Sequence, residues 1–283
     1  MPIANIRGVN LNYEVLGTHG PWMALSPGGR RALELVRPLG QRMAEAGYRV
    51  LVHDRRNCGL SDIAIGGKSS EYETWADDLH ELLSRHNALP AVLGGGSSGC
   101  RLSLTVALKY PRAVRALLLW RVTGGPFAAQ RLTENYYDQY IRAARAGGMA
   151  AVCELDHFKE RVAARPANRA TLMAMDANAF IAAMERWRDQ FQSGAELPVI
   201  GASERDLGSI RVPTCIIPGN DKTHGLQSGQ IAHDLIPNSE FYHLFTEQLD
   251  VDLGPIEEWH AKTQEHAGIL LDFLHRQHMS AAA

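Results

Sequence analysis

Apolar and polar positions along the first part of the chain predict strands that alternate with helices. Residues 10–16 alternate in polarity, and residues 48–53 are typical of a buried strand. Between them, residues 32–46 have apolar side chains at helical spacing. A second helix is predicted over residues 74–86, with Thr74 as its N-cap. This alternation indicates an α/β fold, a mostly parallel doubly wound sheet covered by helices on both faces.

The pattern changes in the middle of the chain. Residues 124–208 are Ala-rich and helical in spacing, and they contain no convincing strand. Strands return at 212–217 and 241–245. We therefore predict that residues 1–123 and 209–283 form one core and that residues 124–208 form a helical cap, or lid, inserted into it.

Composition limits the classes of protein and of partner. The chain has 283 residues, of which 45% are apolar and 21% charged, as is usual for a soluble globular protein. Its net charge of −2 provides no field that would attract nucleic acid or an anionic membrane. No stretch approaches the roughly 18 apolar residues of a membrane span. The expected partner is a small-molecule substrate, and a homodimer is compatible with the sequence.

The cysteines and histidines point to no metal and to no disulfide framework. The four cysteines lie far apart and form no C-x-x-C pair, which favours free thiols in a reducing compartment and a cytoplasmic location. No cluster of candidate ligands has the spacing of a metal or cofactor site. We therefore expect chemistry without a cofactor.

One glycine-rich turn has the pattern of a catalytic serine. Residues 95–99 read Gly-Gly-Ser-Ser-Gly and match G-x-S-x-G, with a short apolar strand before them and a helix after them. The turn must be tight, so glycines flank the serine because a Cβ there would collide with backbone. A serine at a helix N-terminus also lies where a developing anion is favoured. Ser97 is the expected nucleophile, with Ser98 as its competitor.

Three stretches resemble the α/β-hydrolase fold superfamily. Residues 97–120 are similar to its elbow, helix and next strand, including Tyr110-Pro111, and residues 54–62 resemble its D-x-R-G-x-G-x-S-D loop. Residues 8–13 are similar to its opening strand. Counting back from the proline favours Ser97 over Ser98, since fourteen positions is the usual interval in the family. The resemblance implies a capped serine hydrolase, as in its esterase, lactonase and C–C bond hydrolase branches.

In this fold the chain order is serine, acid, histidine, and the acid is readily proposed. Gly219-Asn220-Asp221 follows a predicted strand and resembles the G-x-D acid loop of the family. Asp221 would hold the tautomer of the catalytic imidazole and stabilise the imidazolium. A residue that only shapes an Asx-turn is the structural alternative.

The catalytic histidine is chosen from seven that follow Asp221. Residues 259–266 are similar to the H-x-x-x-x-E-H run of the family, whose first histidine is catalytic, so His260 is expected to be the base. His266 is the alternative, although it shares a helical stripe with apolar residues and can also be a buried structural histidine. His224 is set aside because it lies three residues after Asp221, in the same loop.

An oxyanion hole needs two N–H donors, and the loop after the early strand is unusual here. The family usually has the sequence His-Gly-x in this loop, whereas residues 25–30 of this chain are Leu-Ser-Pro-Gly-Gly-Arg. Pro27 has no N–H, so the donors are predicted to be Gly28 and the residue after the nucleophile, Ser98. Gly29 is the fallback donor.

Substrate contacts are expected from this loop and from the cap. In the α/β-hydrolase family that this chain resembles, the cap covers the catalytic serine and supplies most of the substrate pocket. Gly29 and Arg30 are predicted to bind substrate. The guanidinium of Arg30 would bind a carboxylate of the substrate, and the equal alternative is that Arg30 forms an ion pair on the protein surface. Trp187 is predicted to be a polar anchor in the cap.

The leading hypothesis is a serine hydrolase that cleaves a carboxylic ester, lactone or thioester through an acyl-enzyme. Hydrolysis of a carbon–carbon bond next to a ketone is an alternative that uses the same residues. A signal receptor or a lyase on the same fold, with little hydrolytic turnover, is a further alternative. Reaction with a fluorophosphonate separates the first two hypotheses from the third.

Overall fold

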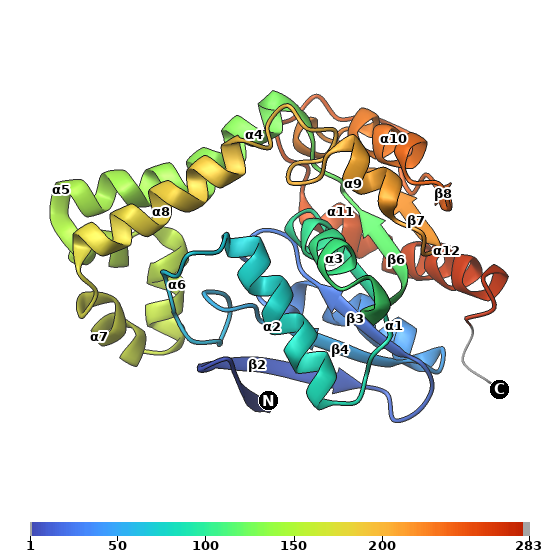
Figure 1. Cartoon of the computed structure of the whole chain (residues 1–283), viewed down its shortest axis with the longest axis horizontal. Helices are drawn as coiled ribbons and strands as arrows, with labels where there is room; N and C mark the ends of the chain where they lie inside the picture. Colours follow the sequence, from blue (N-terminus) through green and yellow to red (C-terminus); the bar gives the residue numbers. More distant parts are fainter. Residues whose placement is uncertain (1, 280–283) are drawn as a thin grey trace.

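The computed structural model describes residues 2–279, so residues 280–283 of the predicted second core segment lie outside it. The described chain contains an eight-stranded sheet in the order β1-β2-β4-β3-β5-β6-β7-β8 (Figure 1). The strands are β1 (Ile3–Ile6), β2 (Val9–Leu16), β3 (Trp22–Ser26), β4 (Arg49–His53), β5 (Ala91–Gly96), β6 (Val114–Trp120), β7 (Thr214–Ile217) and β8 (Ser239–Phe241). β2 pairs antiparallel with β1 and β4, and every pair from β4 to β8 is parallel. The predicted mostly parallel sheet is confirmed.

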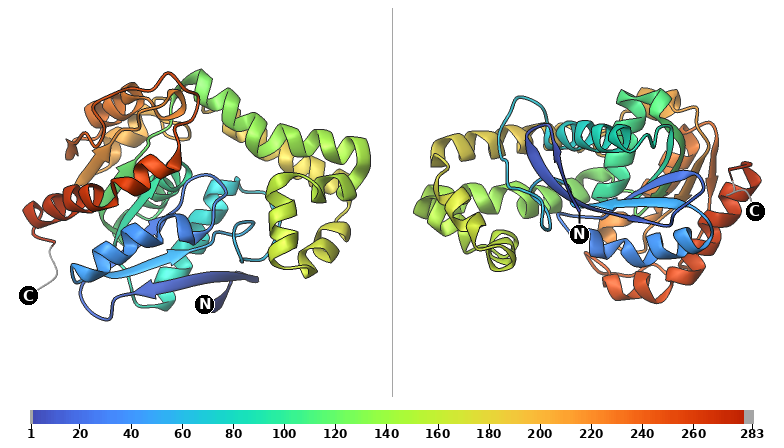
Figure 2. Two further views of the ribbon diagram at one scale, coloured as in Figure 1. Left: turned by 180° about the vertical axis from the view of Figure 1, so that it is seen from behind. Right: turned by 90° about the horizontal axis from the view of Figure 1, so that it is seen from below.

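Helices cover both faces of this sheet, as Figure 2 shows. Side chains of β4 alternate between the faces: Leu51 joins one core cluster, whereas Val50 and Val52 join the other. The cluster around Leu51 includes side chains from α2 (Glu71–Arg85), α3 (Ser98–Lys109) and α10 (Leu226–Leu235). The opposite cluster includes side chains from α1 (Arg37–Glu45), α11 (Ile256–Ala261) and α12 (Thr263–Arg276). Both faces of the central strands, such as β4 and β5, are therefore buried, which explains their nearly continuous apolar runs.

Several element boundaries differ from the prediction, including those of α2 and of the last strand. α2 begins three residues earlier than Thr74, because Ser70 and Glu73 form a capping box in which each side chain accepts the other's backbone N–H. The last strand is also shorter, since β8 ends at Phe241 and the predicted strand over 241–245 does not form.

The insertion between β6 and β7 is helical and has a core of its own. It contains α4 (Gly125–Thr133), the π-helical turn η3 (Glu134–Asp138), α5 (Gln139–Cys153), α6 (Asp156–Ala164), α7 (Ala167–Met173) and α8 (Ala177–Gln192). Buried side chains such as Tyr140, Phe158 and Met184 form a third apolar cluster there. In Figure 1 these helices extend away from the sheet. α9 (Glu204–Ser209), in contrast, packs Leu207 into the core of the sheet domain.

Within residues 2–279, no helix combines the length and the apolar character needed to cross a bilayer.

Candidate active site

Ser97 lies on a strained turn between β5 and α3. Its backbone angles are φ 54° and ψ −112°, in the left-handed region that L-residues rarely adopt. The flanking glycines are required sterically. A Cβ on Gly95 would lie 2.4 Å from the carbonyl carbon of Gly99, and a Cβ on Gly99 would lie 2.1 Å from the carbonyl oxygen of Ser26. The turn lifts the serine hydroxyl at the carboxyl end of the sheet.

A chain of hydrogen bonds joins Ser97 to an imidazole and a carboxylate. The Oγ atom of Ser97 lies 2.9 Å from Nε2 of His224. Nδ1 of the same ring lies 2.8 Å from Oδ1 of Asp221. All three residues are buried. Donation from Nδ1–H to the carboxylate leaves the Nε2 lone pair to accept the hydroxyl proton of the serine.

A single turn of 3-10 helix brings His224 above Asp221. The turn, η4 (Lys222–His224), follows Asp221, whose carboxylate accepts the backbone N–H of His224 at 2.8 Å. Side chains three residues apart eclipse each other in a 3-10 helix, so the carboxylate and the imidazole share one side. The turn also needs Gly219, because a Cβ there would lie 2.4 Å from the Cβ of His224.

The structure corrects the predicted histidine. His260 lies in α11, is exposed, and has its Nε2 atom 3.4 Å from the carbonyl oxygen of Leu35. His266 is buried in α12 between the rings of Trp120 and Trp259. Both line the cavity beside Ser97, but it is His224 that forms the hydrogen bond with its hydroxyl, while α11 and α12 pack their apolar side chains into the core cluster beside α1. The Asp-x-x-His spacing after β7 was the available signal.

Two further donors hold the second oxygen of Asp221. Nη2 of Arg121 lies 2.8 Å from Oδ2, and the backbone N–H of Gly254 lies 3.0 Å from it. Burial alone would raise the pKa of Asp221, but the hydrogen bond from His224 and the charge of Arg121 outweigh it and hold that pKa well below its usual range. The carboxylate is therefore ionised at neutral pH.

The imidazole is neutral at physiological pH. Burial lowers the pKa of His224 to about 4, with a smaller contribution from the Arg121 charge and against the opposing effect of the hydrogen bond to Asp221. A neutral imidazole beside a hydroxyl has the protonation state of a general base.

The predicted oxyanion residues lie next to Ser97. A Cβ on Gly28 would lie 3.4 Å from the Cβ of Ser97, so the loop after β3 touches the nucleophile turn. Ser98 is the first residue of α3, and its N–H is one of those that a helix leaves without an internal partner. Gly29 has φ 52°, and its carbonyl oxygen accepts a hydrogen bond from Arg55 at 2.5 Å.

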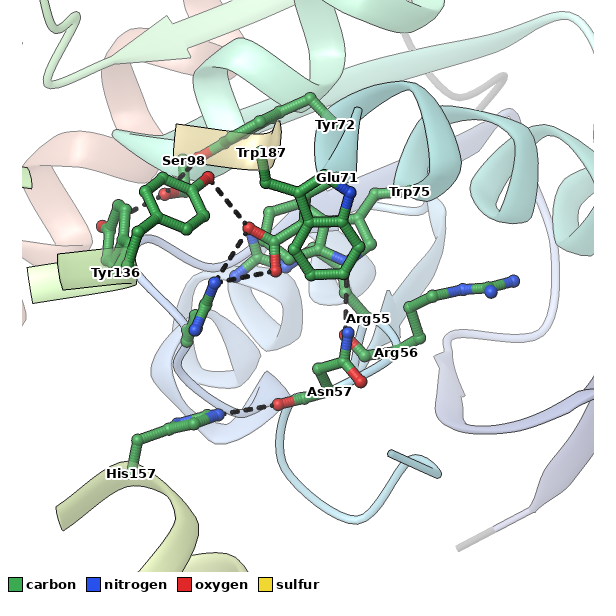
Figure 3. Close-up of polar contacts among 12 residues, drawn as sticks. Arg55, Arg56, Asn57, Glu71, Tyr72, Trp75, Ser98, Tyr136, His157 and Trp187 are labelled. Atoms are coloured by element: carbon green, nitrogen blue, oxygen red, sulfur yellow. Dashed lines mark hydrogen bonds and ion pairs between the residues drawn. The ribbon is translucent and has the colours of Figure 1, made fainter. Parts of the chain in front are cut away.

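The hydroxyl of the competing serine faces a different environment. Ser98 Oγ lies 2.9 Å from the hydroxyl of Tyr72 and 3.3 Å from that of Tyr136, as Figure 3 shows. Tyr72 belongs to α2 and Tyr136 to the cap. Within the described chain, its hydrogen-bond partners include no imidazole. Ser98 thus links the nucleophile turn to the cap and lacks the neighbour that would activate it.

Arg30 and Trp187 bind other parts of the protein. Arg30 forms an ion pair of 3.1 Å with Glu71, and both side chains are buried rather than on the surface. The indole N–H of Trp187 donates to the carbonyl oxygen of Ser69 at 3.1 Å, which ties α8 to the core. Neither residue lines the cavity beside Ser97, and neither does Gly29. Their roles in substrate binding stay predictions.

Two cavities adjoin this region. A small one of about 60 Å³ lies beside Ser97 and is lined by residues of the core, including Gly28 and Arg121. A larger cleft of about 650 Å³ separates α8 of the cap from α2 and α3, with Tyr72, Arg101 and Trp187 on its walls. The cap therefore borders the cleft, whereas the space next to the nucleophile belongs to the core.

The described side chains form no metal centre. Over residues 2–279, no group of three or more His, Cys, Asp or Glu side chains has an arrangement that could hold a metal ion.

Sequence comparisons match part of the core and the beginning of the helical insertion. Residues 21–143 match the family described as alpha/beta hydrolase fold. An uncharacterized hydrolase of Bacillus subtilis, YraK, is 30% identical over 113 residues, which are 40% of this chain and 41% of that protein. The chain thus matches less than half of the length of this curated relative.

Solved structures extend the likeness to nearly the whole chain. An enol-lactonase from Burkholderia xenovorans has a TM-score of 0.63 and 20% identity, covering 95% of this chain and 99% of its own. A thermophilic esterase from Thermogutta terrifontis has a TM-score of 0.64 and 20% identity, with coverage of 96% and 99%. A meta-cleavage product hydrolase from Pseudomonas fluorescens has a TM-score of 0.64 and 17% identity, with coverage of 95% and 97%. Together with the strand order and the nucleophile turn, these findings show that the chain has the α/β-hydrolase fold.

Proposed function

We propose that this protein is a serine hydrolase that cleaves a carboxylic ester, lactone or thioester through an acyl-enzyme. The observation that supports this most strongly is the hydrogen-bonded chain from Ser97 through His224 to Asp221, with distances of 2.9 and 2.8 Å. A nucleophile, a base and a residue that orients the base are the groups that acyl transfer requires.

In the first step the Oγ atom of Ser97 attacks the carbonyl carbon of the substrate. The new C–O bond forms as Nε2 of His224 takes the hydroxyl proton, and the carbonyl π electrons move to oxygen. The N–H groups of Gly28 and Ser98 stabilise that oxyanion. Asp221 stabilises the imidazolium and stays ionised, because Arg121 and Gly254 hold its second oxygen.

In the second step the tetrahedral intermediate collapses. The bond to the leaving oxygen or sulfur breaks, and the imidazolium of His224 gives its proton to that atom. A water molecule then attacks the acyl-enzyme while His224 takes a proton from it. Collapse of this second intermediate returns the proton to Ser97 and releases the carboxylic acid.

Labelling with a fluorophosphonate tests the proposal directly. We expect the wild-type protein to be labelled at one site, Ser98→Ala to be labelled as well, and Ser97→Ala to remain unlabelled, because Ser97, unlike Ser98, has the imidazole of His224 at 2.9 Å. Heat-denatured protein provides the control for nonspecific reaction. A wild-type protein that does not react would favour a receptor or a lyase, and labelling of Ser97→Ala would contradict the assignment of the nucleophile.

The pH dependence of activity provides a second test. The base must be neutral, and burial lowers the pKa of His224 to about 4. We therefore expect kcat/KM to be flat near neutral pH and to fall only as pH approaches about 4, well below the pH 6.5 that is usual for histidine. Arg121→Met removes a neighbouring charge that lowers this pKa, so its acid limb is expected at higher pH.

In these profiles kcat/KM is measured during a brief incubation of the enzyme at each acidic pH. Each sample is returned to pH 7.5 and assayed again, so that loss of folded protein is separated from protonation of the base. An acid limb near pH 6.5 in the wild type would contradict a buried, neutral His224.

A further inference from the structure

The cavity beside Ser97 has an unusual wall for a pocket inside an apolar core. Its volume is about 60 Å³, and no carboxylate occurs among the described residues that line it. Apolar side chains such as Leu35 and Leu39 form one part of the wall. Arg121, Trp259 and His266 form another.

Each of these three side chains retains a nitrogen without a partner. Among the described residues, Nε of Arg121, Nε1 of Trp259 and Nε2 of His266 are buried and make no hydrogen bond. The exposed fractions of the three residues are only 7%, 5% and 4%. Buried donors are nearly always satisfied in proteins, so three of them on one small cavity indicate a bound group that supplies acceptors.

The three side chains form one cluster. The ring centroids of Trp259 and His266 are 5.6 Å apart, and Cζ of Arg121 lies 5.5 Å from the Trp259 ring. The indole and the guanidinium can only donate hydrogen bonds. Burial lowers the pKa of His266 to about 3, so its ring is neutral and can donate or accept. The chemistry of this cluster therefore suits an oxygen that accepts hydrogen bonds.

The position of the cavity indicates which part of a substrate enters it. Ser97 and Gly28 line it, but His224 does not. The leaving group has to reach Nε2 of His224 to receive its proton, so it departs on the other side of Ser97. The cavity thus faces the acyl group. The cavity has a volume of about 60 Å³, so it can hold about four groups of the size of a water molecule.

We propose that this cavity selects a short acyl group that carries a hydrogen-bond-accepting oxygen beyond the scissile carbonyl, with Arg121, Trp259 and His266 as the donors. The inference rests on the proposed function and adds the acyl specificity to it. Ether, hydroxyl, keto and carboxylate oxygens share this chemistry.

Two esters of nearly equal size test the acyl specificity. The 4-nitrophenyl esters of methoxyacetate and butyrate differ by one ether oxygen in place of a methylene. After division by their rates with hydroxide, we expect wild-type kcat/KM to favour methoxyacetate about 10-fold, as one satisfied buried donor implies. We expect kcat/KM for octanoate to be lower than for butyrate, because its chain exceeds the cavity.

Variants link this preference to the donors. Trp259→Phe keeps the aromatic ring but removes the N–H, and it is expected to lower the methoxyacetate-to-butyrate ratio towards the hydroxide value. His266→Leu provides an independent reading if Trp259→Phe folds poorly. Trp22→Phe is the matched control, since Trp22 lies at the opposite end of β3 and stacks on Arg49. Its ratio should equal that of the wild type.

The outcomes separate this inference from the proposed function. If the esters are cleaved but the ratio matches hydroxide, or persists in both Trp259→Phe and His266→Leu, the cavity assignment is wrong and the hydrolase proposal stands. If no ester is cleaved and no fluorophosphonate reacts, the proposed function itself is wrong.

Discussion

His224→Ala is expected to lower kcat/KM for ester hydrolysis by about ten-thousand-fold or more, because the variant has no base within reach of Ser97. The wild-type imidazole lies 2.9 Å from the serine oxygen and accepts its proton as the carbonyl is attacked. Steady-state kinetics with the best ester of the panel measure this loss. Circular dichroism and thermal melting show whether the variant remains folded.

Other histidines provide the comparison for this variant. His260→Ala removes an exposed side chain near the cavity and should lose a few-fold at most, with the same acid limb as the wild type. His243→Ala removes an exposed imidazole beyond β8 and should behave as the wild type. A large loss in His260→Ala together with retained activity in His224→Ala would show that the base had been assigned wrongly.

Mild acid is expected to reduce the free energy of unfolding strongly, because burial keeps several histidines neutral in the folded state, among them His53, His224 and His266. Burial lowers the pKa of His53 to about 3, of His224 to about 4 and of His266 to about 3. An unfolded histidine titrates near 6.5, so the unfolded state binds more protons below that pH and is favoured there. The contribution of these three histidines to the free energy of unfolding is fully present above about pH 6.5 and is lost as pH falls towards 4.

The expected size of this effect is comparable with the whole stability of a domain. Between pH 7.5 and pH 5, each such histidine costs about 2 kcal/mol by proton linkage, and the three together cost on the order of 6 kcal/mol. Urea titrations at several pH values measure this change.

A single substitution isolates the contribution of one histidine. Both ring nitrogens of His53 are buried without a partner in the described chain, so His53→Leu removes the protonation penalty and leaves no donor unpaired. It should lower the slope of unfolding free energy against pH by about 1.4 kcal/mol per pH unit. His243→Ala is the matched control and should keep the wild-type slope. If the free energy of unfolding has the same slope against pH in the wild type and in His53→Leu, then His53 does not stay neutral in the folded protein.

The tie between cap and nucleophile turn connects the fold to the proposed reaction. Tyr136 of the cap and Tyr72 of α2 both contact the hydroxyl of Ser98, whose N–H is a proposed oxyanion donor. His157 of α6 contacts the carbonyl oxygen of Asn57 at 2.9 Å, which adds a second link between cap and core (Figure 3). The position of the cap therefore bears on the geometry around Ser97.

Local sequence by itself determined the sheet, the helical insertion and the turn that carries Ser97. Period-two and period-3.6 patterns depend on near neighbours, and the spacing of Gly95 and Gly99 follows from steric contacts within a few residues. Asp221 was proposed from the resemblance of residues 219–221 to the G-x-D acid loop of the family, and it follows β7 at the carboxyl edge of the sheet.

Tertiary structure alone decided which histidine meets the serine and which nitrogens remain unpaired. His224, His260 and His266 were all available after Asp221, and their sequence context did not say how the chain turns after β7. The 3-10 turn that sets His224 over Asp221 requires Gly219 to let the backbone pass closely, while packing of α11 and α12 leaves the other two rings on the wall of the cavity instead of in a hydrogen bond with Ser97. The cavity wall of Arg121, Trp259 and His266 joins residues from distant segments, because the free energy of apolar burial brings those segments together irrespective of their separation along the chain.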